Sequence, residues 1–447
     1  MNRKWFYGKI FLALMLFSLV YVLPIDLQPQ ARATLAITLL AMTLWISEAM
    51  PLEATALLVA FLLVIAGGFQ ADAVFSQFFD RVVVLVLGGF AIAVAMSRHK
   101  LDEYLGYKVL GRFGSSAKSV LLGTVAVTAF LSMWMSNSAA AAIMMPIAVI
   151  LLRKNRIKKM HSNFAKSMVL AVGYGATIGG IGTLIGSTPN VITQKFLAEK
   201  GITFGFVEWG VRGFPFMVLM VIACWLVLHH VFRPEIRKLA TKKHPHPFTL
   251  EQKKVAAIFV LTVFLWVTES VHGIHNSIIA LVPIILLYLF RLIDTHDFHK
   301  VGWDSLILIG GGIALGMAID KSGLDDIVSS SLGSSLAGQH YFFVLLAMGV
   351  VGIALTSFIS NTAASAVLIP IVTALSGMLG VDMTNLVVAA AIGVSLDFIF
   401  PMGTPPSALA YSTGYIHVKE MIKAGILISI AGALIMAGMA YFSWGLF

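Results

Sequence analysis

The sequence predicts an all-α polytopic membrane protein made of two inverted repeats, with about 11 transmembrane helices and two re-entrant hairpins. Three observations predict this fold. Of the 447 residues, 59% are hydrophobic and 12% are charged, whereas charged residues make up about a quarter of a soluble domain. A short polar triplet occurs twice in this apolar chain, and Lys and Arg gather in alternate loops.

The apolar stretches come first, because a helix of about 20 residues crosses the hydrocarbon core of a bilayer. They are 5–24, 31–49, 52–68, 81–100, 163–195, 209–232, 254–270, 276–291, 303–320, 384–412 and 422–446. The first stretch lacks a small-residue cleavage site, so the segment 1–30 is expected to be a retained N-terminal helix. The single Cys224 excludes a disulfide within one chain.

Two further apolar stretches, 117–151 and 341–378, are each interrupted near their middle by the polar triplet. The triplets are Ser136-Asn137-Ser138 and Ser360-Asn361-Thr362, and around them 132–147 and 356–371 share 7 identities in 16 positions. Polar interruptions are costly in a bilayer unless they line a cavity. Each stretch is therefore predicted to be a re-entrant hairpin with its triplet at the tip.

The charge distribution supports this layout. With the N-terminus in the cytoplasm and neither hairpin crossing, 25 of the 31 Lys and Arg residues lie in inner segments, the pattern of a multi-pass protein of the cell (inner) membrane. The inner segments are 1–9, 98–118, 153–166, 233–254, 291–300 and 413–424. The basic inner loops face anionic lipid, and this accounts for the net charge of +10. The positive charge therefore does not indicate a nucleic-acid-binding protein.

Further landmarks recur in the same order and at a nearly constant offset. Trp45 corresponds to Trp266, Gly88-Gly89 to Gly311-Gly312, Leu101-Asp102 to Leu324-Asp325, and Thr188-Pro189 to Thr404-Pro405. The chain is therefore divided into a first repeat at 31–232, a basic cytoplasmic linker at 233–253 and a second repeat at 254–447. Repeats of inverted topology place a binding site near the membrane midplane.

The polar groups at this predicted site are hydroxyls and amides. The Thr-Pro elements lie inside apolar stretches, and a proline after small polar residues is typical of a break followed by a new half-helix. Half-helix N-termini direct N–H groups at an anion, and C-terminal carbonyls suit a cation. Four such N-termini could hold a dianion without a buried arginine.

With these motifs in place, the whole chain resembles the divalent anion:sodium symporter family of dicarboxylate and citrate transporters, often called INDY proteins. The paired triplets and paired Thr-Pro elements are its most specific marks. The resemblance implies sodium-coupled symport of dicarboxylates, a homodimer, and a scaffold that carries an elevator-type transport domain. Na+ would be the co-transported ion, and no organic cofactor is expected.

The same resemblance assigns site residues. Substrate carboxylates would touch Asn137, Ser138, Ser187, Pro189, Asn361, Thr362, Thr404 and Pro405. One sodium would lie near Ser132, Ser136, Asn137 and Gly186, and another near Thr356, Ile359, Asn361 and Gly403. Two positions depart from the family pattern: Ser138 stands where Thr is usual, and Ser407 where Asn often follows the prolines.

Asp397 is a further departure, since an ionisable group at membrane depth is a functional candidate by default. Two hypotheses follow: Asp397 takes part in ion or proton coupling, or it is a structural carboxylate held by hydrogen bonds.

Three function classes follow, in descending order. The first is a sodium-coupled dicarboxylate symporter, with a sodium-independent exchanger of the same family as its variant. The second is a cation/proton antiporter that uses Asp397. An enzyme is the weakest, because no acid, base and nucleophile gather at one depth. The expected partners are a small dicarboxylate, membrane lipid and a second copy of the chain.

Overall fold

A computed structural model describes residues 3–23, 26–157, 160–239 and 247–446, which leaves 240–246 of the predicted linker outside the described residues. The described residues form helices and no strand, apart from one isolated bridge between Ser116 and Lys238. The all-α prediction is confirmed.

The first half of the chain follows the predicted order closely. Its longer helices are α1 (Arg3–Val22), α2 (Pro29–Ser47), α3 (Leu52–Ile65), α5 (Arg81–Arg98), α7 (Ala117–Ser132), α8 (Asn137–Lys154), α9 (Asn163–Gly179), α10 (Thr188–Glu199) and α11 (Phe206–Phe232). Shorter elements are α4 (Ala71–Phe75), α6 (Leu101–Leu110), η1 (Ser76–Phe79) and η2 (Gly111–Phe113).

The second half repeats this order with different loop lengths. Its longer helices are α12 (Leu250–Val267), α15 (Leu281–Leu289), α17 (Trp303–Lys321), α18 (Leu324–Leu336), α19 (Tyr341–Thr356), α20 (Asn361–Leu379), α21 (Met383–Val394), α22 (Pro405–Ser412) and α23 (Val418–Phe442). Shorter elements are α13 (Glu269–His272), α14 (Asn276–Ile279), α16 (Thr295–Phe298) and η3 (Trp444–Leu446).

Both interrupted stretches are divided at the triplet. α7 ends at Ser132 and α8 begins at Asn137, while α19 ends at Thr356 and α20 begins at Asn361. Six segments in the described chain are long and apolar enough to cross a membrane, among them α8 and α20. Helix length therefore does not distinguish a re-entrant arm from a crossing helix, and the re-entrant path remains a prediction from the charge pattern.

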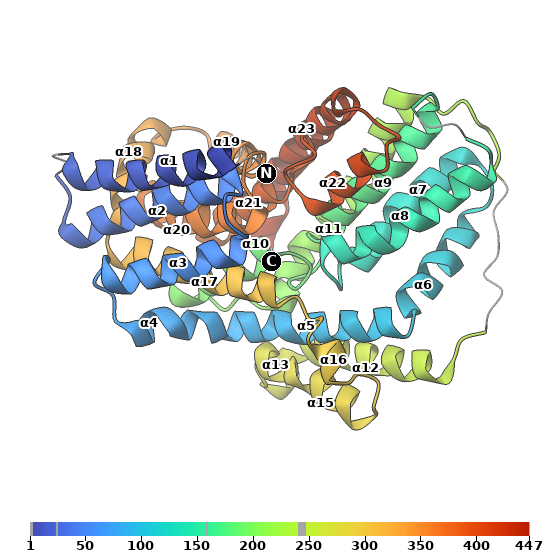
Figure 1. Cartoon of the computed structure of the whole chain (residues 1–447), viewed down its shortest axis with the longest axis horizontal. Coiled ribbons are helices and arrows are strands. Elements are labelled where there is room, and N and C mark those ends of the chain that lie inside the picture. Colours follow the sequence, from blue (N-terminus) through green and yellow to red (C-terminus); the bar gives the residue numbers. More distant parts are fainter. Residues whose placement is uncertain (1–2, 24–25, 158–159, 240–246, 447) are drawn as a thin grey trace.

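The halves of the two broken spans pack crosswise between the repeats. In the first repeat, α9 packs on α7 and α8, but α10, the continuation of the same span, packs on α20 and α21. In the second repeat, α22 returns to α8 and α9. Figure 1 shows α7 and α8 to one side of the molecule and α20 to the other. Each hairpin therefore meets half of a broken span from the opposite repeat.

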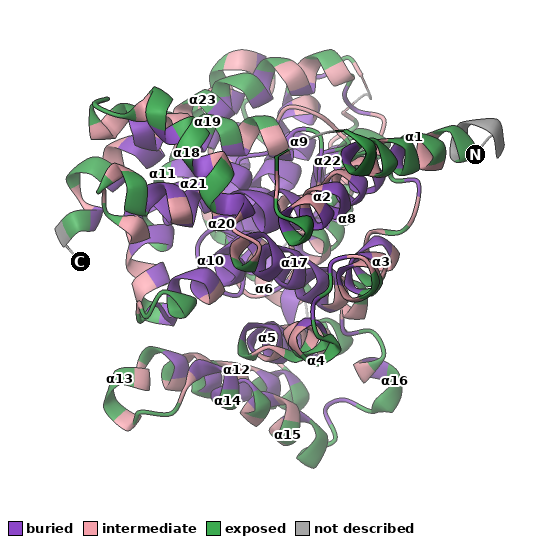
Figure 2. Ribbon diagram, turned by 90° about the vertical axis from the view of Figure 1, so that its left-hand side faces the viewer, coloured by how far each residue is buried: buried purple, intermediate pink, exposed green. Residues whose placement is uncertain are grey.

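A separate layer lies beside this core. α12, α14 and α15 pack on α5, and Figure 2 shows them below the buried centre of the molecule. α3 packs on α17, which also contacts α20. α3, α5 and α17 together face the hairpin tips.

Two helices, α6 and α18, were not predicted. They begin at the repeat landmarks Leu101 and Leu324 and connect α5 to α7 and α17 to α19. The acid that follows each landmark, Asp102 or Asp325, is buried. Each of these carboxyls also has one oxygen without a hydrogen-bond partner.

Asp325→Asn is expected to stabilise the protein at neutral pH. Burial, together with the nearby negative charge of Asp320, raises the pKa of Asp325, which lies outside the predicted spans, from 3.8 to about 6. Between about pH 4 and pH 6 the Asp325 carboxyl holds its proton in the folded state but has lost it in the unfolded state. The free energy of unfolding therefore falls as pH rises through this range. The variant should melt a few degrees above the wild type at pH 7, with the difference vanishing near pH 4.

Melting temperatures in detergent between pH 4 and pH 8 test this expectation. Asp326→Asn is the matched control, because Asp326 lies in the same turn but is exposed. Parallel melting curves for the wild type and Asp325→Asn across the pH range would show that the buried carboxyl carries no pH dependence.

Candidate functional site

The hairpin tips are shaped by helix caps. The N–H of Ala139 donates to Ser136 Oγ at 3.3 Å, and the N–H of Ala363 donates to Ser360 Oγ at 3.3 Å. A serine at the N-cap ends the connecting turn and starts the helix. Each triplet thus holds its asparagine in the first turn of α8 or α20, where the unpaired N–H groups of a helix N-terminus lie.

The broken spans supply two more N-termini. α9 ends at Gly179 and α10 starts at Thr188, and the amide of Asn190 stabilises the loop between them by donating to the carbonyls of Gly180 at 2.8 Å and Thr183 at 2.7 Å. In the second span, α21 ends at Val394 and α22 starts at Pro405. The predicted breaks at both Thr-Pro elements are present.

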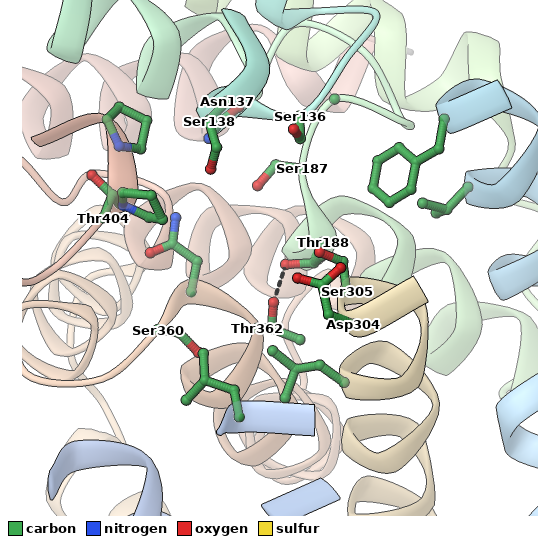
Figure 3. Close-up of a pocket in the computed structure, with 18 of the residues that line it drawn as sticks. Ser136, Asn137, Ser138, Ser187, Thr188, Asp304, Ser305, Ser360, Thr362 and Thr404 are labelled. Atoms are coloured by element: carbon green, nitrogen blue, oxygen red, sulfur yellow. Dashed lines mark hydrogen bonds between the residues drawn. The ribbon is translucent and has the colours of Figure 1, made fainter. Parts of the chain in front are cut away.

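All four N-termini border one cavity of about 260 Å³. Figure 3 shows Ser138, Ser187, Thr362 and Thr404 around it. Seven of the eight predicted substrate residues line it: Asn137, Ser138, Ser187, Asn361, Thr362, Thr404 and Pro405. Thr188 and Thr362, from opposite repeats, are hydrogen-bonded across 2.6 Å. No Lys, Arg or His is among the described residues of the lining.

Some predicted residues lie behind the lining. Pro189 is buried in the first turn of α10, and Pro406 reaches the cavity from α22 instead. Among the predicted sodium residues, Ser136, Asn137, Gly186, Asn361 and Gly403 line the cavity, whereas Ser132, Thr356 and Ile359 are buried next to it along the chain.

Oxygen atoms crowd together at the first tip. Ser132 Oγ lies 2.8 Å from Asn137 Oδ1 and 2.6 Å from the carbonyl oxygen of Ala176. One hydroxyl hydrogen can serve only one of these two acceptors. Carbonyl oxygens near a half-helix C-terminus, here that of α9, are the ligands that transporters offer to Na+. The oxygens at this tip therefore have the chemistry of a cation site.

The second tip repeats the arrangement. Thr356 Oγ1 donates to Asn361 Oδ1 at 2.6 Å, the counterpart of the Ser132–Asn137 contact. Both hydroxyls are fully buried. The two tips thus share one pattern, in which a buried hydroxyl from the first arm of a hairpin orients the asparagine of the second.

The sequence analysis missed several cavity residues. α3 and α5 contribute Leu52, Glu53, Val86 and Phe90, and α17 contributes Asp304, Ser305 and Leu308. Asp304 could have been recognised as a cavity residue from the sequence, because it is an acid in the first turn of the apolar helix α17. None of these residues belongs to a hairpin or to a broken span. One wall of the cavity is therefore formed by the uninterrupted helices α3, α5 and α17.

A second cavity of about 610 Å³ adjoins the first, and both are lined by Phe90, Ser136, Ser138, Asp304 and Ser305. Its far end is lined by Arg98, Asp102, Asp297 and Lys300. Arg98 is paired there with Asp297 and, at 2.9 Å, with Asp294. A third cavity, lined by Arg81 and Lys195, shares no described residue with the first. The second cavity thus extends from the residues of the central cavity toward the side of the predicted inner loops.

Comparisons with known proteins agree on one family. The family model described as "Sodium:sulfate symporter transmembrane region" matches residues 2–447. The sodium-dependent dicarboxylate transporter SdcS of Staphylococcus aureus strain USA300 is 33% identical to this chain over 96% of the chain and 89% of SdcS. SdcS of strain NCTC 8325 matches to the same extent.

A solved structure resembles the chain in fold alone. The Alcanivorax borkumensis YdaH transporter, whose crystal structure is described as having an unusual topology, superposes with a TM-score of 0.60 at 12% identity. The match covers 92% of this chain and 99% of YdaH.

Proposed function

Because this chain belongs to the sodium:sulfate symporter family and is therefore a multi-pass membrane transporter and not an enzyme, we propose that it carries succinate-like C4 dicarboxylates together with Na+. The observation that carries the proposal is the meeting of four half-helix N-termini around a single cavity of about 260 Å³. The name of the related SdcS proteins supports both the dicarboxylate and the sodium.

The donors in the cavity suit a dianion. Serine and threonine hydroxyls, the asparagine amides and the N-terminal N–H groups of α8 and α20 are available to two carboxylates. The first turns of α10 and α22 contain proline, which has no N–H, so these two helices contribute mainly the positive ends of their dipoles. The cavity is smaller than the roughly 300–1,000 Å³ typical of sites for drug-sized ligands. A four-carbon diacid fits this scale and this chemistry.

The two acids in the lining, Glu53 and Asp304, belong to the wall formed by α3 and α17. A carboxylate repels a dianion, so this wall offers the substrate little attraction. Apart from the Ser305 hydroxyl on α17, the hydrogen-bond donors of the lining come from the hairpins and the broken spans. A substrate bound to only one of the two groups of helices can move with that group, which supports an elevator movement against a scaffold of α3, α5 and α17.

The arrangement of the cavities supports an inward-facing state. The second cavity leads from the hairpin tips to Arg98 and Lys300, which lie in the predicted inner segments 98–118 and 291–300. An elevator movement would carry the site to the opposite side. The homodimer implied by the family resemblance remains a prediction.

Uptake of labelled succinate into proteoliposomes tests the function. We expect an inward sodium gradient to drive accumulation of succinate into vesicles that lack internal dicarboxylate, and choline in place of sodium to abolish it. Uptake only when the vesicles contain dicarboxylate would show exchange in place of symport.

Excess unlabelled competitors separate the substrate classes. Malate and fumarate should inhibit the uptake, and sulfate should inhibit it weakly. Proton flux without movement of any anion would contradict the proposal and indicate the antiporter.

A further inference from the structure

The carboxylate of Asp397 has no hydrogen-bond partner among the described residues. It lies in the loop between α21 and α22, and 0% of its surface is exposed. Neither carboxylate oxygen accepts a hydrogen bond in the described structure. Within the described residues, no Lys, Arg or His forms an ion pair with it.

Burial of such a group is unfavourable twice over. An uncompensated charge away from water costs several kcal/mol. Asp397 also follows the end of α21 at Val394 by three residues, and a helix C-terminus carries partial negative charge. A carboxylate in this place is relieved either by a proton or by a cation beside it.

The carboxylate faces the rear of the cavity wall. It fills the space that a Cβ atom on Gly403 would need, so the two residues are in direct contact. Gly403 itself lines the central cavity together with Asn361. The buried negative charge therefore lies next to Gly403, one of the residues predicted to hold the second sodium.

The corresponding loop of the first repeat has no such acid. When the Thr-Pro elements are aligned at their offset of 216 residues, Ile181 takes the place of Asp397. The carbonyl of Ile181 accepts a hydrogen bond from Trp209 Nε1 at 2.8 Å, and its side chain is buried. A break in a span thus forms without a carboxylate, so the loop geometry does not account for Asp397.

We propose that Asp397 is a ligand for a monovalent cation at the second hairpin tip, next to Gly403 and the Thr356–Asn361 pair. This inference rests on the proposed function, under which the cation is Na+. The chain then has two unequal cation sites: a first tip of neutral oxygens alone, and a second tip with a formal negative charge. The second site is the stronger one, because a carboxylate attracts a cation more than a neutral oxygen does.

Sodium binding by the purified protein tests the proposal without relying on transport. The melting temperature of the wild type is followed during titration with NaCl at constant ionic strength with choline chloride, since a ligand that binds only the folded state raises it. We expect Asp397→Asn to weaken the apparent sodium affinity at least tenfold. We also expect the variant to melt above the wild type without sodium, because it removes an uncompensated buried charge, and below it at saturating sodium.

Asp102→Asn is the matched control, since Asp102 is also buried with an unpartnered carboxylate oxygen but lies at the start of α6. Its sodium titration should match the wild type. If Asp397→Asn does not yield folded protein, Asp397→Ser serves in the same titration.

Three outcomes decide the matter. A sodium midpoint shifted by Asp397→Asn but not by Asp102→Asn supports the proposal. An unchanged midpoint overturns it and leaves sodium-coupled transport intact. A wild type that does not respond to sodium overturns it together with the sodium coupling, and succinate added to the same samples then shows whether the anion site exists.

Discussion

Replacement of either tip asparagine by alanine is expected to reduce sodium-driven succinate uptake to background. Asn137 and Asn361 each start a half-helix, line the cavity and pair with a buried hydroxyl. Loss of a hydrogen bond to a charged group costs about 1.5–3 kcal/mol, which corresponds to roughly a 10- to 150-fold weaker affinity. Loss of a cation ligand at the same tip adds to this, because each asparagine is predicted to serve both ions and substrate.

Binding and uptake should be measured for each variant, with succinate-dependent and sodium-dependent melting shifts beside proteoliposome transport. Asn155→Ala is the control, because Asn155 caps the opposite end of α8, where its amide donates to the carbonyl of Leu151. It should transport like the wild type. Full uptake by Asn137→Ala or Asn361→Ala would mean that the tips do not hold the substrate.

Gly180→Ala is expected to cause the next largest loss of uptake, about tenfold or more, although it adds a single methyl group. A Cβ on Gly180 would lie 2.5 Å from Asn137 Oδ1. Gly180 has φ −57° and ψ −22°, which alanine adopts readily, so the backbone is not strained. The methyl group must instead push the carboxamide of Asn137 away from its place, and overpacking of this kind typically costs about 1–3 kcal/mol.

The effect should appear first in sodium binding, since Asn137 Oδ1 belongs to the oxygen cluster of the first tip. Gly210→Ala is the control, because a Cβ on Gly210 in α11 would meet no atom within 4 Å. A Gly180→Ala protein with wild-type sodium and succinate midpoints would show that Asn137 is not a ligand in this position.

Local patterns in the sequence were enough to predict the fold class and to detect the internal repeat. Hydropathy predicted helices such as α5 and α17 to within two residues at each end, because a bilayer imposes a length and a polarity on every span. The triplets and the Thr-Pro elements predicted four interruptions, and the chain turns or breaks at all four. A polar group in an apolar run is visible without knowledge of its neighbours.

Other features could not be read from spacing. The approach of Gly180 to the Asn137 amide depends on how α9 packs on α8. The helices α6 and α18 are only partly apolar, so hydropathy did not separate them from loops.

What the sequence alone determined is the chemistry of the tips: uncharged donors, repeated, at membrane depth. Only the tertiary structure decided that α10 packs on the second hairpin and α22 on the first. It also placed Asp304 and Glu53 on the opposite wall of the cavity. The same packing brings Asp397 against Gly403, with no hydrogen-bond partner for its carboxylate among the described residues. Composition and periodicity act over a few residues, whereas these contacts join segments that the packing of helices brings together from distant parts of the chain.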